Sequence, residues 1–181
     1  FYDDEFMLQI TAGEGSRIYY TTDGSIPNES STLYTGEIEV KDICGDLARF
    51  RTIHNVRDDW LNFTPQEIYG DKGSIIRAVA IDKHGNVSDV ITKVYYVGKA
   101  VSQDADYKNK YVLSVVVDPE EMFGDNGIYV TGKAYDDWYL GLSDIEVEPN
   151  FMKAGREYEI EASVTLLYNN ELLMEQEAGI R

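Results

Sequence analysis

The sequence is poor in the residues from which disulfides and metal centres are built. Cys44 is its single cysteine, and His54 and His84 are its two histidines. One cysteine can form neither an internal disulfide nor a thiolate metal cluster. Such scarcity fits a reducing cytosol, and it fits equally well the cysteine-poor surface proteins of Gram-positive bacteria. For each histidine, surface or loop packing is the more ordinary role, because the sequence indicates no convergent partners for a metal or nucleophile site.

Long hydrophobic runs and positive charge are also scarce. No stretch of about 18 apolar residues occurs, so no membrane-spanning helix is predicted. The 33 acidic and 16 basic side chains give a formal net charge of −17, which repels nucleic-acid phosphates and anionic lipid. We therefore expect neither nucleic-acid binding nor membrane insertion, and the charge serves most simply for solubility. Because the chain starts at Phe1 without Met or a signal peptide, we expect that it is trimmed at both ends.

Phosphate-binding loops of the GxxxxGK[ST] and GxGxxG types are absent, and no catalytic triad is visible. We therefore expect no catalytic residue and no cofactor in this chain. Acidic residues do gather at Asp118, Glu120, Glu121 and Asp125. They supply only part of the ligand spacing that a Ca²⁺ loop requires, so a turn or helix cap is the more ordinary interpretation and no metal site is predicted.

Hydrophobic residues make up 43% of the chain and 14 residues are tyrosine, a composition that favours strands. Alternation and turn dipeptides predict strands at residues 5–10, 17–22, within 33–40, and at 74–82 and 87–97. Residues 83–86 would connect the last two as a hairpin. Regular turns without βαβ alternation predict a β-sandwich over residues 1–98. Near-helical spacing of apolar residues predicts a short helix or compact insertion within residues 41–72.

A polar segment, residues 99–110, is the predicted linker to a second β-rich unit, residues 111–181. We expect a buried strand at 111–117, a helical turn capped by Asp118 with Pro119 at its first position, a strand at 128–130 and a helical turn at 136–142. Residues 158–168 and 172–178 should form a hairpin around Asn169-Asn170, and its polar face, where Ser163 alternates with Glu159 and Glu161, should be towards solvent. The predicted fold class is thus mainly all-β.

Two pairs of acids each precede a tryptophan: Asp58-Asp59 before Trp60, and Asp136-Asp137 before Trp138. A carboxylate beside an exposed ring can bind a sugar, because the ring stacks on a pyranose and the acid bonds its hydroxyl groups. Trp60 and Trp138 are therefore candidate carbohydrate-binding residues. The more ordinary alternative is a core tryptophan with solvated neighbours. Glycosidase chemistry would need two carboxylates across a cleft, which a sequence cannot place.

The first half also carries a motif, Ile18-Tyr19-Tyr20-Thr21-Thr22-Asp23-Gly24-Ser25-Ile26-Pro27 followed by Leu33-Tyr34-Thr35-Gly36. It resembles the chitobiase/β-hexosaminidase C-terminal-type domain, and residues 76–80, 85–88 and 92–96 match that family's final hairpin. The resemblance covers about residues 1–97, with residues 41–72 as an insertion. It implies a small immunoglobulin-like β-sandwich with an accessory role, and no reaction.

The second half is similar to the opening of a spore-coat protein H (CotH) kinase domain. The matching stretches are Leu113-Ser114-Val115-Val116-Val117-Asp118-Pro119, Met122-Phe123, Gly127-Ile128-Tyr129-Val130 and Ala178-Gly179-Ile180-Arg181. In that family the nucleotide- and metal-binding residues lie mostly beyond the equivalent of Arg181, so the resemblance assigns no catalytic residue here.

Together these resemblances imply a non-catalytic accessory module at the front of a CotH-kinase-like protein of the bacterial cell surface or spore coat. Its partner would be the following kinase-like domain. The alternative is a carbohydrate-binding module that binds surface polysaccharide through Trp60 and Trp138. A third possibility, an active kinase or hydrolase, would need a nucleotide or metal site that the sequence does not display.

Overall fold

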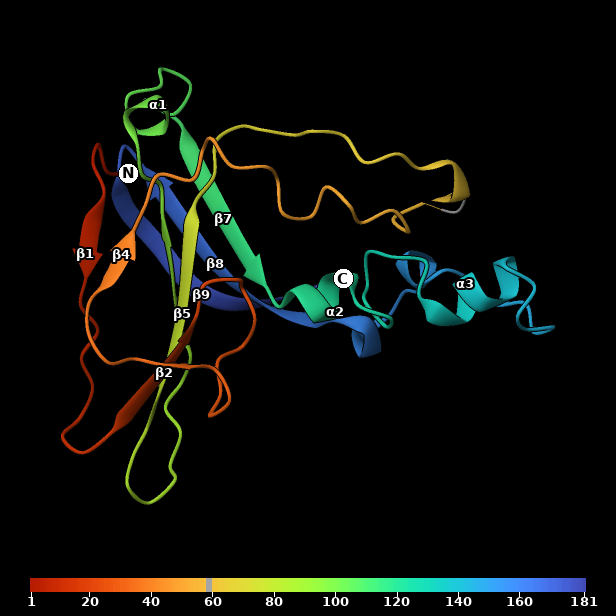
Figure 1. The fold of residues 1–181 in the computed structure, drawn as a ribbon, viewed down its shortest axis with the longest axis horizontal. Coiled ribbons are helices and arrows are strands. Elements are labelled where there is room, and N and C mark those ends of the chain that lie inside the picture. Colours follow the sequence, from red (N-terminus) through yellow and green to blue (C-terminus); the bar gives the residue numbers. More distant parts are fainter. Residues whose placement is uncertain (58–59) are drawn as a thin grey trace. The chain divides into compact units, whose positions relative to one another are not determined.

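The computed structural model describes residues 1–57 and 60–181, and it is mainly β (Figure 1). The described residues form three antiparallel sheets. The first pairs β1 (Phe6–Leu8) with β4 (Ile38–Val40). The second has the order β3 (Thr32–Leu33), β2 (Arg17–Thr21), β5 (Ser74–Ile81), β6 (Ile91–Tyr95). The third has the order β7 (Tyr111–Val117), β8 (Ile160–Tyr168), β9 (Glu171–Ile180). The predicted all-β class is confirmed.

The helices are short. They are α1 (Lys99–Ser102), α2 (Pro119–Phe123), α3 (Lys133–Tyr139) and the 3₁₀ turns η1 (Trp60–Asn62), η2 (Asn150–Met152) and η3 (Arg156–Tyr158). None of the helices in the described part of the chain is long and apolar enough to cross a membrane. The chain forms two compact units: a first unit of Phe1–Asp46, Gly70–Val116 and Ser163–Gln176, and a second unit of Leu47–Tyr69, Val117–Ala162 and Glu177–Arg181. The predicted linker at residues 99–110 stays a prediction.

The core of the first unit lies on the second sheet. Tyr19 on β2 pairs in register with Val79 on β5, and both side chains are buried with Ile81. The first sheet adds Phe6, whose ring meets the ring of Tyr95 on β6 edge-on at 5.4 Å. Burying such large apolar and aromatic groups stabilises the fold by about 1.5–3 kcal/mol for each side chain. Tyr19 and Tyr95 therefore serve as packing groups of the first unit.

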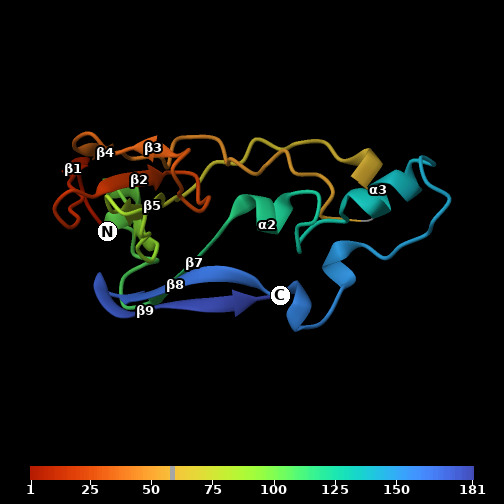
Figure 2. The same ribbon diagram turned by 90° about the horizontal axis from the view of Figure 1, so that it is seen from below.

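Figure 2 shows β8 and β9 side by side in the third sheet. Hydrogen bonds connect the part of that sheet that belongs to the first unit to β6 and to the residue that follows it. Ser163 on β8 donates a hydrogen bond to Thr92 Oγ1 at 2.9 Å, and the Tyr96 hydroxyl lies 2.6 Å from Ser114 Oγ. Ser163 is only 5% exposed, whereas the alternating pattern placed it on a solvent face. That prediction was wrong because β6 covers this face of β8. Ser163 can be buried there because its hydroxyl is hydrogen-bonded to Thr92.

Several local predictions can be compared directly. Asp118 caps α2 by accepting a hydrogen bond from Glu120 N at 2.9 Å, with Pro119 at the first helical position, as predicted. Asn169 and Asn170 have φ values of 49° and 67°, the left-handed conformation that a tight hairpin turn needs.

Two further local predictions differ from the structure at least in part. Residues 128–130 form a turn instead of a strand, because the amides of Ile128 and Tyr129 bond back to Glu121 O and Met122 O at the end of α2. Within residues 41–72 the structure contains a single 3₁₀ turn, η1, instead of a regular helix, in the part of that segment that it describes. The other alternative for this segment, a compact insertion, stays a prediction.

Tyr107 provides a pH prediction for the first unit. Its hydroxyl donates to Asp71 Oδ2 at 2.8 Å, and chiefly this bond raises the pKa of Tyr107 to about 12. Because the neutral phenol is favoured in the folded state, its stabilisation is fully present below about pH 10 and is lost as the pH rises through about 12. We expect NMR titration of the tyrosine rings to show one late phenol, absent in Tyr107→Phe. In Asp71→Ala its pKa should move back towards about 10; an unchanged value there would exclude the Asp71 bond as the cause.

Candidate functional site

Residues 21–27, the turn of the motif that resembles the chitobiase-type domain, are held by hydrogen bonds within the turn and by one from β5. Thr21 Oγ1 donates to Ser25 O at 2.6 Å, and Ser25 N donates to Asp23 Oδ1 at 3.0 Å. Gly24 has φ of 86°, which favours glycine. Arg77 on β5 donates from Nη1 to Gly24 O at 2.9 Å, and its side chain is buried at 2% exposure. The motif is thus a structural turn fastened to the sheet.

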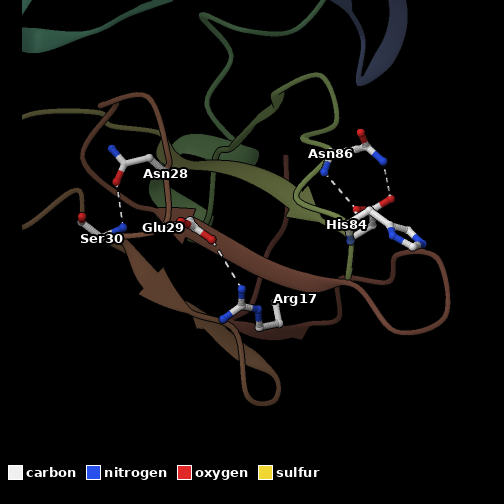
Figure 3. A network of polar contacts seen from close by, with 7 residues as sticks. Arg17, Asn28, Glu29, Ser30, His84 and Asn86 are labelled. Atoms are coloured by element: carbon white, nitrogen blue, oxygen red, sulfur yellow. Dashed lines mark hydrogen bonds and ion pairs between the residues drawn. The ribbon is translucent and has the colours of Figure 1, made fainter.

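The polar residues of the neighbouring loops contact one another and hold the loops in place (Figure 3). Arg17 and Glu29 form an exposed ion pair at 3.4 Å. Asp82 accepts hydrogen bonds from the side-chain and backbone amides of Asn86 and from the backbone N of His84. These bonds, the Asn86 side chain first, lower the pKa of the Asp82 carboxyl. Asp82 and His84 therefore build the hairpin turn at residues 83–86, which is the ordinary role expected for this histidine.

Asp136 on α3 is the centre of a polar cluster in the second unit. Its Oδ1 accepts hydrogen bonds from Trp60 Nε1 at 3.0 Å and from the hydroxyl of Thr131, and its Oδ2 accepts from Asn55 Nδ2 at 3.2 Å. The backbone adds a bond from Thr131 N to Asn55 O at 2.6 Å, and Thr131 is fully buried. The Asp136 carboxylate therefore joins Asn55, Trp60 and Thr131. We call these three residues together with Asp136 the Asp136 cluster.

Aromatic rings extend from this cluster along α3. Trp60 lies 6.1 Å from Tyr139, Tyr139 is stacked on Tyr135 at 5.9 Å with 15° between the ring planes, and Tyr135 meets Trp138 edge-on at 5.4 Å. On the other side, His54 contacts Trp60 at 4.9 Å and Phe63 at 6.3 Å. Six rings thus form one continuous series, which we call the ring row: Phe63, His54, Trp60, Tyr139, Tyr135 and Trp138.

Both tryptophans singled out in the sequence lie in the ring row, and each is partly exposed. Of the four acids beside them, Asp136 is part of the cluster and Asp137 pairs with Lys133 at 2.7 Å, while Asp58 and Asp59 lie outside the described residues. Sequence reasoning missed Asn55, Tyr135 and Tyr139. The two tyrosines could have been found from their spacing to Trp138, since residues three and four apart share one side of a helix.

The acids weighed as cation ligands take other roles. Asp118 caps α2, and Glu120 and Glu121 lie in the first turn of that helix, where carboxylates stabilise the helix dipole. Within residues 1–57 and 60–181, no group of three or more histidine, cysteine, aspartate or glutamate side chains is arranged to hold a metal ion. Asp118, Glu120 and Glu121 are therefore arranged as the start of α2.

The first half of the chain matches a known family model. Residues 6–95 match the family model described as "Fn3 associated". This match is consistent with the resemblance of the first half to a chitobiase-type β-sandwich, and it indicates an accessory type of β domain. No curated protein and no solved structure matches the chain. The resemblance of the second half to a CotH kinase opening stays a prediction.

Proposed function

We propose that this chain is a non-catalytic accessory module that positions a CotH-kinase-like domain of a bacterial surface or spore-coat protein. The match of residues 6–95 to an Fn3-associated family supports the accessory role. The resemblance of residues 111–181 to a kinase opening supplies the domain to be positioned.

The observation that carries the positioning role is the path of residues 47–69. They lie in sequence between β4 and β5, inside the matched accessory region, yet they form one compact unit with residues 117–162. The joining contacts are the Asp136 cluster and the rings of Phe50 and Phe123, 4.9 Å apart. A segment inserted in the accessory region therefore holds the segment that follows that region, as expected of a module that fixes where a neighbour begins.

Three carboxylates of this chain take part in structural contacts. Asp136 accepts three side-chain hydrogen bonds, Asp137 is paired with Lys133, and Asp82 closes a hairpin turn. Phosphoryl transfer requires a lysine on the phosphates and acids that hold metal ions. Such engagement of the acids supports a role in which this chain supplies geometry while its parent protein supplies any reaction.

Thermal melting with nucleotide tests the proposal. We expect the same melting temperature with and without ATP and Mg²⁺ or Mn²⁺. A ligand that binds only the folded state, at about 100 times its Kd, would stabilise by roughly 2.7 kcal/mol and shift the melting temperature visibly. A nucleotide-binding kinase melted in the same buffers serves as the positive control. A nucleotide-dependent shift of this chain would contradict the non-catalytic role.

A further inference from the structure

We propose that β7, a strand at the edge of the third sheet, joins two copies of this chain by pairing antiparallel with β7 of the second copy. This interface goes beyond the positioning role, because it gives the chain a partner of its own kind. Among the described residues, β7 has a strand neighbour, β8, on one side only. An edge strand presents backbone N–H and C=O groups with which another strand can pair. The pairing would turn two three-stranded sheets into one sheet of six strands.

The outer edge of β7 borders a groove. Residues 113–116 line this groove, which has a volume of about 240 Å³, together with Gly73, Ile75, Val94 and Tyr96. Successive residues of a strand point to opposite faces of the sheet. A groove lined by four successive residues therefore follows the edge of the strand, where the backbone groups of a second strand would lie.

The side chains of β7 are complementary to a second copy of the same strand. Tyr111, Leu113 and Val115 are 69%, 58% and 47% exposed, and they alternate along the strand with residues that are less exposed. No residue of Tyr111–Val117 is charged, and none is glycine or proline. In an antiparallel pair centred on Ser114, Leu113 of each copy lies opposite Val115 of the other. Each apolar cross-strand contact is therefore formed twice, as in an interface with two-fold symmetry.

The charges that flank β7 select the same arrangement. Residues 108–110, directly before the strand, include two lysines, and residues 118–121, directly after it, include three acids. Antiparallel pairing brings the lysine end of each copy to the acidic end of the other, so opposite charges meet at both ends of the interface. Lys110 also forms an ion pair with Asp106 at 3.2 Å, but both side chains are largely exposed and the pair is weak.

The opposite edge of the third sheet disfavours further growth of that sheet. Its strand β9 contains Glu171, Glu175 and Glu177, whereas β7 has no charged residue. Charged side chains on an edge strand hinder its pairing with another copy. Pairing through β7 leaves a β9 strand at each end of the six-stranded sheet, so the assembly closes at two copies.

Sedimentation velocity of the full chain at about 1–100 µM tests the interface. We expect a reversible equilibrium between monomer and dimer. Leu113→Lys and Val115→Lys place a charge opposite an apolar residue, and each should raise the Kd of the dimer at least about tenfold. The matched control is Leu172→Lys on β9, where the leucine is 54% exposed, and this variant should dimerise like the unaltered chain. Melting curves verify that each variant is folded.

A mixing experiment tests whether the two β7 strands face each other. The double variants Leu113→Lys/Val115→Lys and Leu113→Glu/Val115→Glu should each be monomeric, and an equal mixture of the two should dimerise. In the unaltered chain, amides of β7 should exchange more slowly at high protein concentration, whereas amides of β9 should not change.

A chain that stays monomeric over this range would overturn the inference. So would a dimer whose Kd is unchanged by Leu113→Lys, because another surface would then form it, or a mixture of the double variants that stays monomeric. Because none of these measurements involves nucleotide, their failure is distinguishable from failure of the proposed accessory role.

Discussion

Replacing Arg77 by alanine is expected to lower the free energy of unfolding by about 3–5 kcal/mol, one of the two largest single-residue effects in the chain. The side chain is 2% exposed and lies on β5, the strand that pairs with both β2 and β6. Truncation leaves a cavity in the sheet and removes the donor to Gly24 O. Both effects act on the motif turn, so urea unfolding should show a lower midpoint with an unchanged slope.

Arg77→Met separates packing from hydrogen bonding. Methionine fills most of the volume and makes no bond to Gly24 O, so we expect a smaller loss, about 1–2 kcal/mol. Part of the cost of the native arginine is already visible, since its Nε is buried without a hydrogen-bond partner among the described residues. A buried charge can be replaced by an apolar group at little cost when its pairing is incomplete. If Arg77→Ala were no less stable than Arg77→Met, the cavity argument would be wrong.

Those parts of the fold that depend on neighbours in the sequence could be predicted. Asp23-Gly24, the Asp118-Pro119 cap and the Asn169-Asn170 turn each use local backbone geometry that a dipeptide specifies. Ser163 was misplaced because its burial depends on Thr92, 71 residues away. Residues 128–130 look like a strand by composition, yet their amides bond to the end of α2. Hydrogen bonds to a preceding helix override a weak strand preference.

The candidate site shows the same division. Both tryptophans could be selected from the sequence, because each directly follows a pair of acids. Their connection could not be predicted, since Asp136 reaches Trp60 across 76 positions and Asn55 across 81. A sequence also cannot tell which of two adjacent acids is occupied. Asp136 joins the cluster while Asp137 pairs with Lys133 on its own helix, although the two are chemically identical neighbours.

Replacing Asp136 by alanine should therefore loosen the whole second unit. Three hydrogen bonds from Asn55, Trp60 and Thr131 lose their acceptor, and the hydroxyl of fully buried Thr131 is left without this acceptor. We expect a loss of about 2–4 kcal/mol, because a buried donor that loses its acceptor costs its desolvation energy as well as the bond. Hydrogen exchange measures this loss of stability. In Asp136→Ala the Thr131 amide, which donates to Asn55 O, and the Trp60 indole N–H should exchange faster.

Asp137→Ala is the matched control, since it removes the same charge one residue away on the same helix. Asp137 forms a partly exposed ion pair with Lys133, which should contribute little to stability because water and salt screen exposed charges. Slow exchange at Thr131 and Trp60 should survive in Asp137→Ala and be lost in Asp136→Ala. Similar losses in both variants would mean that helix charge, and not the cluster, stabilises the unit. Loss in Asp136→Ala alone would place the junction of residues 47–69 with residues 117–162 on one carboxylate, as the positioning role requires.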